Sequence, residues 1–195
     1  MKNLCCFLLC LASSLLFAQA KKPVKVPDVF EPAYVLTLKG DTIKGQLKLP
    51  KLSRFENYEK IYFKDIKTNK VRQYLPHKIT GYGYNNYFYT SAYHDNKPCF
   101  FKVLSKGTLT LYAFYTEVYD EGKPFEVHDY SVSREGAKDE EFFLLEAKGT
   151  KKQLKDLFKT NKDLVKKINE QKEIPFNDET FEAYFNEFNG VGKTD

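Results

Sequence analysis

The fold of this chain is set by one stretch of sequence, Tyr34-Val35-Leu36-Thr37-Leu38-Lys39-Gly40-Asp41-Thr42-Ile43-Lys44-Gly45-Gln46-Leu47-Lys48-Leu49. Apolar and polar residues alternate on both sides of Gly40-Asp41, and a period of two is typical of half-buried strands. Glycine supplies the positive φ that a primed two-residue turn needs. The stretch therefore predicts a β-hairpin with Gly40-Asp41 at the centre of its turn.

This turn sets the register, with Leu38 opposite Ile43 and Leu36 opposite Gly45. One face of the predicted hairpin then carries Tyr34, Leu36, Leu38, Ile43, Leu47 and Leu49, and the other carries Val35, Thr37, Lys39, Thr42, Lys44, Gln46 and Lys48. A slip of one residue would turn the leucines toward water, so the pattern favours one register.

Similar strand signals recur along the chain, separated by turns rich in Gly, Pro, Asn and Asp. They cover residues 61–64, 71–75, 79–84, 87–93, 99–104, 108–118, 125–132 and 141–147. With the first hairpin they make roughly nine strands, which fits an antiparallel sandwich, roll or open barrel.

The hydrophobic period changes after Thr150, which is predicted to form a capping box with Gln153. Helical spacing follows, with a break near residues 160–161, and Asp178 is predicted to cap a last helix that ends at Gly190. The helical positions are Leu154, Leu157, Phe158, Val165, Ile168, Phe181, Tyr184, Phe185 and Phe188. We expect one α+β domain over residues 33–190, with two or three helices in 150–190, preceded by a proline-containing arm at 21–32.

Residues 1–20 have the pattern of a cleaved secretory signal peptide: a basic start, an apolar run and Ala-Gln-Ala at the end. The run is too short for a permanent membrane span. Neither Cys5 nor Cys10 follows the small residue that a lipoprotein signal needs, so simple cleavage after Ala20 is preferred to a lipid anchor. We expect export to the periplasm, the outer envelope or the medium.

Cleavage would remove three of the four cysteines and leave Cys99. The mature chain then has no internal disulfide, and it is long enough to bury roughly 70% of its unfolded surface without one. Cys99 alternates with Phe101 and Val103, which indicates a buried thiol that acts as a small hydrophobic group. The net charge of +5 is mild and does not indicate a nucleic-acid partner.

Tyrosines gather in the predicted hairpin of residues 79–93. If Asn85-Asn86 forms its turn, five of them share one face while Gly81, Gly83 and Phe88 share the other: Tyr82, Tyr84, Tyr87, Tyr89 and Tyr93. Aromatic rings on a rigid sheet can stack on sugars or bases, so this face is the candidate ligand-binding site. The alternative is that these tyrosines only stabilise the sheet through cross-strand pairs.

Signals for catalysis and for metal binding are weak. The three histidines, His77, His94 and His128, lack metal-ligand spacing, and no cysteine pair or acidic loop adds one. No nucleophile elbow or dinucleotide fingerprint is present. Glu140 and Glu141 are neighbours and would point to opposite faces of a strand. We therefore assign no catalytic residue, no metal ligand and no cofactor.

One charged surface is predicted on the helices. If residues 154–168 form a continuous helix, one side carries Lys155, Lys159, Lys162 and Lys166. The stripe could meet anionic lipid or polysaccharide, although such a stripe is more often a solvated face.

The order of motifs resembles a group of uncharacterised exported proteins from Bacteroidota. The shared motifs are Leu-Lys-Gly-Asp-Thr-Ile-Lys-Gly at 38–45, Tyr-x-Pro-x-x-Ile-x-Gly-Tyr at 74–82, Phe-Phe-Lys-Val-Leu at 100–104, Leu-Tyr at 111–112 and the helical part 154–188. The resemblance implies export into a Gram-negative envelope, and it carries no assigned activity.

Together these observations indicate a non-catalytic envelope protein, a binding or structural module whose partner would be an envelope protein or a glycan. The alternative is a hydrolase that acts on an envelope polymer. A binding module should expose aromatic side chains, whereas an enzyme should bring histidine and carboxylates together in a pocket.

Overall fold

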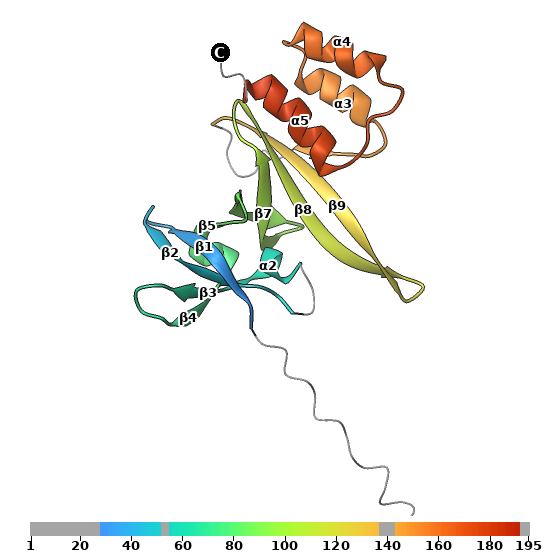
Figure 1. Cartoon of the computed structure of the whole chain (residues 1–195). Coiled ribbons are helices and arrows are strands. Elements are labelled where there is room, and N and C mark those ends of the chain that lie inside the picture. Colours follow the sequence, from blue (N-terminus) through green and yellow to red (C-terminus); the bar gives the residue numbers. More distant parts are fainter. Residues whose placement is uncertain (1–27, 52–54, 137–142, 192–195) are drawn as a thin grey trace, which may run out of the picture.

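The computed structural model describes residues 28–51, 55–136 and 143–191, and in them ten antiparallel strands form one open sheet. The strand order is β10-β9-β8-β7-β6-β5-β1-β2-β3-β4, so β4 and β10 are the edges and the sheet does not close into a barrel. Three helices follow the strands and lie at one end of the sheet (Figure 1). The expected α+β class is confirmed, with an open sheet in place of a barrel.

The strands are β1 (Phe30–Thr37), β2 (Thr42–Lys48), β3 (Ile61–Asp65), β4 (Val71–Tyr74), β5 (Ile79–Tyr84), β6 (Tyr87–His94), β7 (Lys97–Ser105), β8 (Leu109–Asp120), β9 (Lys123–Arg134) and β10 (Phe143–Leu145). The helices are α2 (Glu56–Glu59), the 3-10 turn η1 (Pro76–Lys78), α3 (Thr150–Leu157), α4 (Lys162–Glu170) and α5 (Asp178–Asn189).

The expected signal peptide, residues 1–20, lies outside the described residues, and so does the arm up to residue 27. The rest of the arm differs from expectation, because β1 begins at Phe30. In the part of the chain that the structure describes, no helix is long and apolar enough to cross a membrane.

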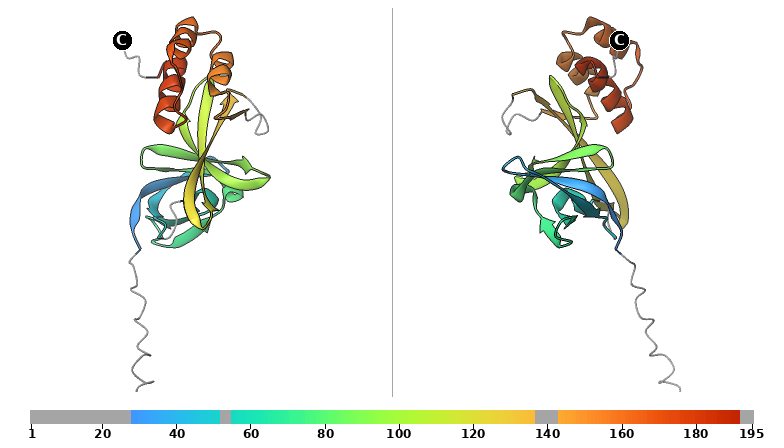
Figure 2. Two further views of the ribbon diagram at one scale, coloured as in Figure 1. Left: turned by 90° about the vertical axis from the view of Figure 1, so that its right-hand side faces the viewer. Right: turned by 60° about the vertical axis from the view of Figure 1, so that its left-hand side comes forward.

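The sheet has two halves with separate cores. One core lies between β1, β2, β3, β5 and β7 and includes Val35, Leu47, Ile61, Phe63, Ile79, Tyr82 and Phe100. The other lies between β7–β10 and the helices. Figure 2 shows the helices at one end and β1–β4 at the other, with β8 and β9 running between them. A third, smaller cluster of aromatic residues joins α2 to β6, β7 and β8.

The register of β1 against β2 differs from the predicted one. Val35 lies opposite Ile43, where the predicted turn placed Leu38. The shift is three residues, and an odd shift exchanges the two faces of a strand. Val35 is therefore fully buried in the same cluster as Leu47, whereas Leu38 is 66% exposed.

The turn itself explains this shift. Thr37 N–H donates to Asp41 O at 2.9 Å, and Gly40 N–H donates to Thr37 O at 2.9 Å, which closes a loop of three residues. The φ of Gly40 is +87°, so a type I turn is followed by a left-handed glycine, another common hairpin loop. The dipeptide Gly40-Asp41 is compatible with either loop, and the longer one buries Val35.

The β5–β6 hairpin has the predicted register. Tyr82 lies opposite Tyr89, and nearer the turn Tyr84 lies opposite Tyr87. Asn85-Asn86 forms the turn with φ of 50° and 65°, values that asparagine tolerates better than most residues. This two-residue turn fixes one register, and the predicted register of β5 against β6 is confirmed.

Three strand glycines, Gly45, Gly81 and Gly83, lie directly under aromatic rings. A Cβ on Gly83 would lie 2.0 Å from the ring of Tyr34, and a Cβ on Gly45 would lie 2.2 Å from Lys64 O and 2.5 Å from the ring of Phe63. The rings therefore occupy the space that a side chain would take. At Gly83 this confirms the close approach that a glycine within a strand suggests.

The predicted capping box at the start of α3 is wrong. Gly149 is the N-cap of α3, and the Thr150 hydroxyl donates to Glu146 O at 2.6 Å. Gln153 Oε1 accepts from Glu146 N–H at 2.9 Å. Both side chains bind the segment after β10, because the sharp entry to the helix brings that segment within reach.

The cap of α5 is one residue earlier than predicted. Asn177 Oδ1 accepts from Thr180 N–H at 2.9 Å, and Asp178 is the first residue of the helix. The helix ends at Gly190 as predicted. Because Asn177 satisfies the helix start, the Asp178 carboxylate is available for other contacts.

Helix α5 is fixed to the sheet along its whole length. Phe181 and Phe185 are fully buried in the core shared with β7–β10. At the far end, Asn189 Nδ2 donates to Leu109 O at 2.7 Å and to Ser105 Oγ at 3.1 Å, while its Oδ1 accepts from Leu109 N–H at 3.2 Å. The start of the helix is held by Asp178 and forms part of the candidate site.

Candidate ligand-binding cavity

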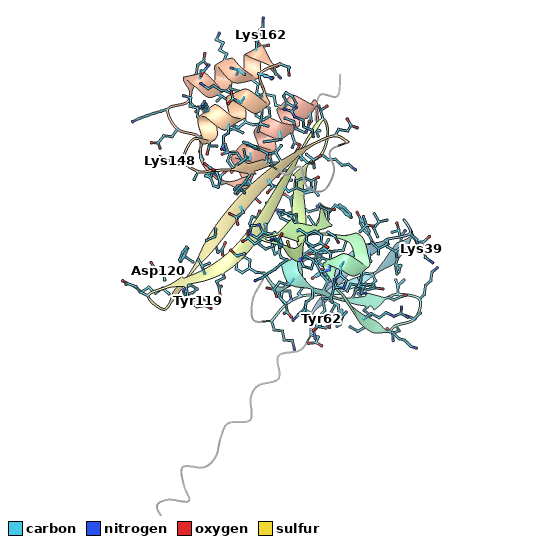
Figure 3. The ribbon with its side chains drawn as sticks, turned by 180° about the vertical axis from the view of Figure 1, so that it is seen from behind. Lys39, Tyr62, Tyr119, Asp120, Lys148 and Lys162 are labelled. Atoms are coloured by element: carbon cyan, nitrogen blue, oxygen red, sulfur yellow. The ribbon has the colours of Figure 1, made fainter. Side chains whose placement is uncertain are left out.

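A cavity of about 510 Å³ opens where the hairpins β5–β6 and β8–β9, the region of α2 and the start of α5 meet. Figure 3 shows side chains packed closely in the middle of the molecule, where the long strands cross the rest of the sheet. Tyr119 and Asp120 lie away from this region, at the tip of the β8–β9 hairpin. The described lining contains carboxylates but no lysine or arginine. It consists of Leu49, Pro50, Phe55, Asn57, Tyr58, Tyr82, Tyr84, Asn85, Tyr89, Tyr115, Glu126, His128 and Asp178.

The aromatic wall of this cavity is tightly packed. Tyr82 and Tyr89 form a parallel stack with ring centroids 4.6 Å apart and planes 1° from parallel. The Tyr82 hydroxyl donates to Asn57 O at 3.1 Å. Tyr58 meets Tyr89 edge-on at 6.0 Å and Tyr115 at 5.6 Å. Such arrangements match the ring quadrupoles, so the wall is formed before any ligand arrives.

One carboxylate connects α5 to three neighbouring strands. Asp178 Oδ2 accepts from Lys102 Nζ of β7 at 3.0 Å and from the Tyr115 hydroxyl of β8, and its Oδ1 accepts from the Tyr130 hydroxyl of β9 at 2.8 Å. Charge-assisted hydrogen bonds are about twice as strong as neutral ones. Asp178 therefore holds the wall residue Tyr115 and the helix in fixed positions.

These bonds also set the charge states. Burial alone would raise the pKa of Asp178, but the hydrogen bonds from Tyr115, Lys102 and Tyr130 outweigh it and leave this pKa below its ordinary value. Burial and the bond to Asp178 raise the pKa of both Tyr115 and Tyr130 far above that of free tyrosine. At neutral pH the carboxylate is ionised and both phenols keep their protons.

Lys102 extends the network to the β5–β6 hairpin. Its side chain is only 13% exposed, and its Nζ lies 3.9 Å from the ring centroid of Tyr87. A cation over an aromatic face is attracted by the ring. Lys102 thus joins Tyr87 to Asp178 without lining the cavity itself.

The outer rim of the cavity belongs to β9. Glu126 Oε2 lies 3.3 Å from His128 Nε2, and the His128 ring lies 4.6 Å from the ring of Tyr115. Glu126 is also directly opposite Glu117 of β8, whose carboxylate accepts from the Tyr119 hydroxyl at 2.7 Å. The rim therefore adds acceptors and an imidazole to the aromatic wall.

The structure separates the five tyrosines of the predicted binding face. Tyr82 is 1% exposed and forms the floor, while Tyr84 and Tyr89 are half-buried and line the cavity. Tyr87 borders a more open hollow of about 1200 Å³ beside β1 and β2, which Tyr84 also lines. Tyr93 is 66% exposed and borders neither. Three of the five are brought together at the cavity.

Sequence reasoning missed the partners that complete this cavity. Asp178 was expected only to cap a helix, and Tyr115 was included only in the predicted strand of residues 108–118. Tyr58 lies between the first predicted hairpin and the predicted strand of residues 61–64, outside every predicted element. Tyr58 meets the ring of Tyr89, and the Asp178 carboxylate accepts from the Tyr115 hydroxyl 63 positions earlier, and no local pattern carries that information.

The other chemical candidates lie elsewhere. Cys99 is 4% exposed and burial raises its thiol pKa to about 12, which confirms the expected buried thiol. His94 Nε2 lies 3.6 Å from Asp129 Oδ2 on the other side of β6 and β9. Among the described residues, no group of three or more His, Cys, Asp or Glu side chains could hold a metal ion.

The predicted lysine stripe is interrupted. Residues 158–161 separate α3 from α4. Lys155 therefore lies on α3, Lys159 lies between the helices, and Lys162 and Lys166 lie on α4. The condition of a continuous helix is not met. The predicted acidic pair, Glu140 and Glu141, lies outside the described residues.

Comparisons of this chain with protein-family models, with curated proteins and with solved structures found no significant match. Function must therefore be argued from the cavity itself.

Proposed function

We propose that this protein is an exported, non-catalytic envelope protein that binds a ligand in the tyrosine-lined cavity. The observation that carries the proposal is a preformed cavity of about 510 Å³ whose aromatic wall is fixed by the Asp178 hydrogen bonds. Its volume falls within the range of roughly 300–1,000 Å³ that is typical of small-molecule sites. Export is supported by the signal-peptide pattern of residues 1–20 and by the resemblance to exported Bacteroidota proteins.

The charge states favour binding over catalysis. A general acid or base works best with a pKa near the working pH. Asp178 is held ionised by three donors, and burial raises the pKa of the Tyr89 hydroxyl to about 12. Neither group exchanges protons easily at neutral pH, but both serve well as fixed hydrogen-bonding groups.

A hydrolase of an envelope polymer is the second candidate. It is favoured by one observation, that Glu126 and His128 line the same cavity and lie within 3.3 Å of each other. The variants Glu126→Gln and His128→Gln distinguish the two functions. A hydrolase would release reducing ends from the polymer and lose this activity in both variants, whereas a binding protein releases none.

The direct test of binding uses tyrosine ring signals in nuclear magnetic resonance. Soluble fragments of the source cell's envelope are titrated into the folded protein labelled with 13C in its tyrosine rings. We expect the signals of Tyr84 and Tyr89 to shift, while those of the exposed Tyr93 and Tyr119 stay in place. Shifts confined to Tyr93 and Tyr119, or no shifts with any fraction, would overturn the proposal.

A further inference from the structure

We infer that the ligand of this cavity is a neutral saccharide, about one or two sugar rings in size. The inference rests on the binding function proposed above and adds the chemical class. A sugar ring has an apolar face that stacks on aromatic rings and a rim of hydroxyl groups that both donate and accept hydrogen bonds. The cavity offers matching groups for each.

Two tyrosine hydroxyls of the cavity lining are not used in hydrogen bonds within the part of the protein that the structure describes. The hydroxyls of Tyr84 and Tyr89 take part in none of the hydrogen bonds found among the described residues, and none of the buried side-chain N or O atoms there lacks a partner. Both hydroxyls are therefore open to solvent. Burial raises the pKa of both residues, so they stay protonated and can donate.

Two other tyrosines of the cavity already use their hydroxyls in hydrogen bonds within the protein. Tyr82 donates to Asn57 O and Tyr115 donates to Asp178. Breaking these bonds would leave buried polar groups unsatisfied, which is unfavourable. The cavity thus separates a fixed scaffold from two open donors, as expected of a preorganised binding site.

The charged and hydrogen-bonding groups of the cavity lining favour a neutral ligand with hydroxyl groups. The described lining holds the carboxylates of Glu126 and Asp178 and no lysine or arginine, and Asp178 is already paired with Lys102, so an anionic ligand would meet the like charge of Glu126. Carboxylate oxygens accept from ligand hydroxyls, and the Asn85 side chain can both donate and accept. A purely apolar ligand would use none of these hydrogen-bonding groups.

The packing of the rings gives Tyr84 and Tyr89 different roles. Tyr82 covers one face of Tyr89 and Tyr58 meets the same ring edge-on, so Tyr89 has little free face for stacking. Tyr84 is half-buried, lies beside the turn and makes no such stack among the described residues. We therefore assign the stacking platform to Tyr84 and a hydroxyl donor to Tyr89.

The test is isothermal titration calorimetry of the full mature chain with a panel of neutral di- and trisaccharides that differ in linkage. Tetramethylammonium and inorganic phosphate serve as charged probes. Tyr84→Ala removes the platform, and we expect it to weaken saccharide binding about tenfold. Tyr89→Phe removes only the hydroxyl and should weaken binding about threefold to tenfold. Tyr93→Ala, on the same hairpin but outside the cavity, is the matched control and should leave affinity unchanged.

Each outcome has a distinct meaning. A saccharide whose affinity falls in both cavity variants and not in Tyr93→Ala supports the inference. Binding of a charged probe alone, with the same dependence on Tyr84, overturns the saccharide class and leaves the proposed function standing. Saccharide binding that is equal in all three variants, or no binding of any probe, overturns the inference, and the envelope-fragment titration then decides the proposed function independently. Thermal unfolding of each variant verifies that it is folded.

Discussion

The two halves of the sheet are stabilised in different ways. In the N-terminal half, rings lie over glycines at short range, and the pairs β1–β2, β2–β3 and β3–β4 join strands that are consecutive in the chain. In the C-terminal half, a helix late in the sequence is bound to strands about 50 to 80 residues earlier by Asp178, Asn189 and a phenylalanine core. The cavity lies where the halves meet, so its shape depends on long-range bonds that only the folded chain contains.

The largest effect is expected from the helix core. Phe185 is fully buried and its ring lies 5.0 Å from that of Phe158. Replacement by alanine removes this contact and leaves a cavity, and such changes reduce stability by about 3–5 kcal/mol. Urea unfolding of Phe185→Ala measures the change. The exposed Phe143→Ala in β10 is the control, and an equal loss in both would contradict the assigned core.

In the N-terminal half of the sheet, stability should fall when a strand glycine is replaced by alanine. Gly45→Ala places a methyl group against a backbone oxygen and a buried ring, and we expect a loss of about 1–3 kcal/mol. At Gly83 the three atoms nearest to an added methyl group all belong to the partly exposed Tyr34 side chain, which can move aside, so the loss in Gly83→Ala should be smaller. Urea unfolding compares the two variants. The opposite order would show that the rings are packed differently.

The connection between the halves is tested by Asp178→Asn. Loss of the charge weakens three hydrogen bonds and leaves the poorly exposed Lys102 without its partner, which should reduce stability by about 2–3 kcal/mol. Glu179→Gln removes a charge from the same helical turn at an exposed site and controls for the helix dipole. If both variants lose the same stability, the network contributes nothing beyond the dipole.

The Asp178→Asn variant also tests how the unfolding free energy depends on pH. The folded-state pKa of Asp178 is below its unfolded value of about 3.9, so the carboxylate stabilises the fold at higher pH. That contribution is complete above about pH 5 and is lost as the pH falls through the lowered pKa. The difference in unfolding free energy between wild type and Asp178→Asn should therefore be constant from pH 5 to 8 and shrink below about pH 4. A difference that grows in acid would contradict the ionised state.

The smallest effect is expected at the β5–β6 turn. Asn86 has a positive φ of 65°, which glycine adopts without strain. Asn86→Gly should leave stability within about 0.5 kcal/mol or raise it slightly, since Asn-Gly is the favoured pair in a type I′ turn. Thermal unfolding is sufficient to measure it. A loss above about 1 kcal/mol would indicate that the Asn86 side chain has a role of its own.

These contrasts also show how far the sequence could be interpreted. Alternation and turn residues predicted the strands, the helical region and the register of the tyrosine hairpin, because those features depend on near neighbours. The predicted β1–β2 register was wrong because Gly40 fits two different hairpin loops. One loop buries Leu38 and the other buries Val35, and only packing in the folded chain selects between them. The site partners Tyr58, Tyr115 and Asp178 were missed because tertiary packing, with no local signal, brings them to the hairpin.

The most direct test of the account is a map of tyrosine nitration in the folded protein by peptide mass spectrometry, which is clean because the chain has no tryptophan. The structure predicts rapid nitration of Tyr93 and Tyr119, intermediate reaction of Tyr84, and protection of Tyr82 and Tyr130 until the protein unfolds. Saturating saccharide should then protect Tyr84 and Tyr89 and leave Tyr93 and Tyr119 reactive. Nitration of Tyr82 as fast as that of Tyr93 would contradict the cavity, because the tyrosines would then form an open face with no Asp178-supported wall behind it.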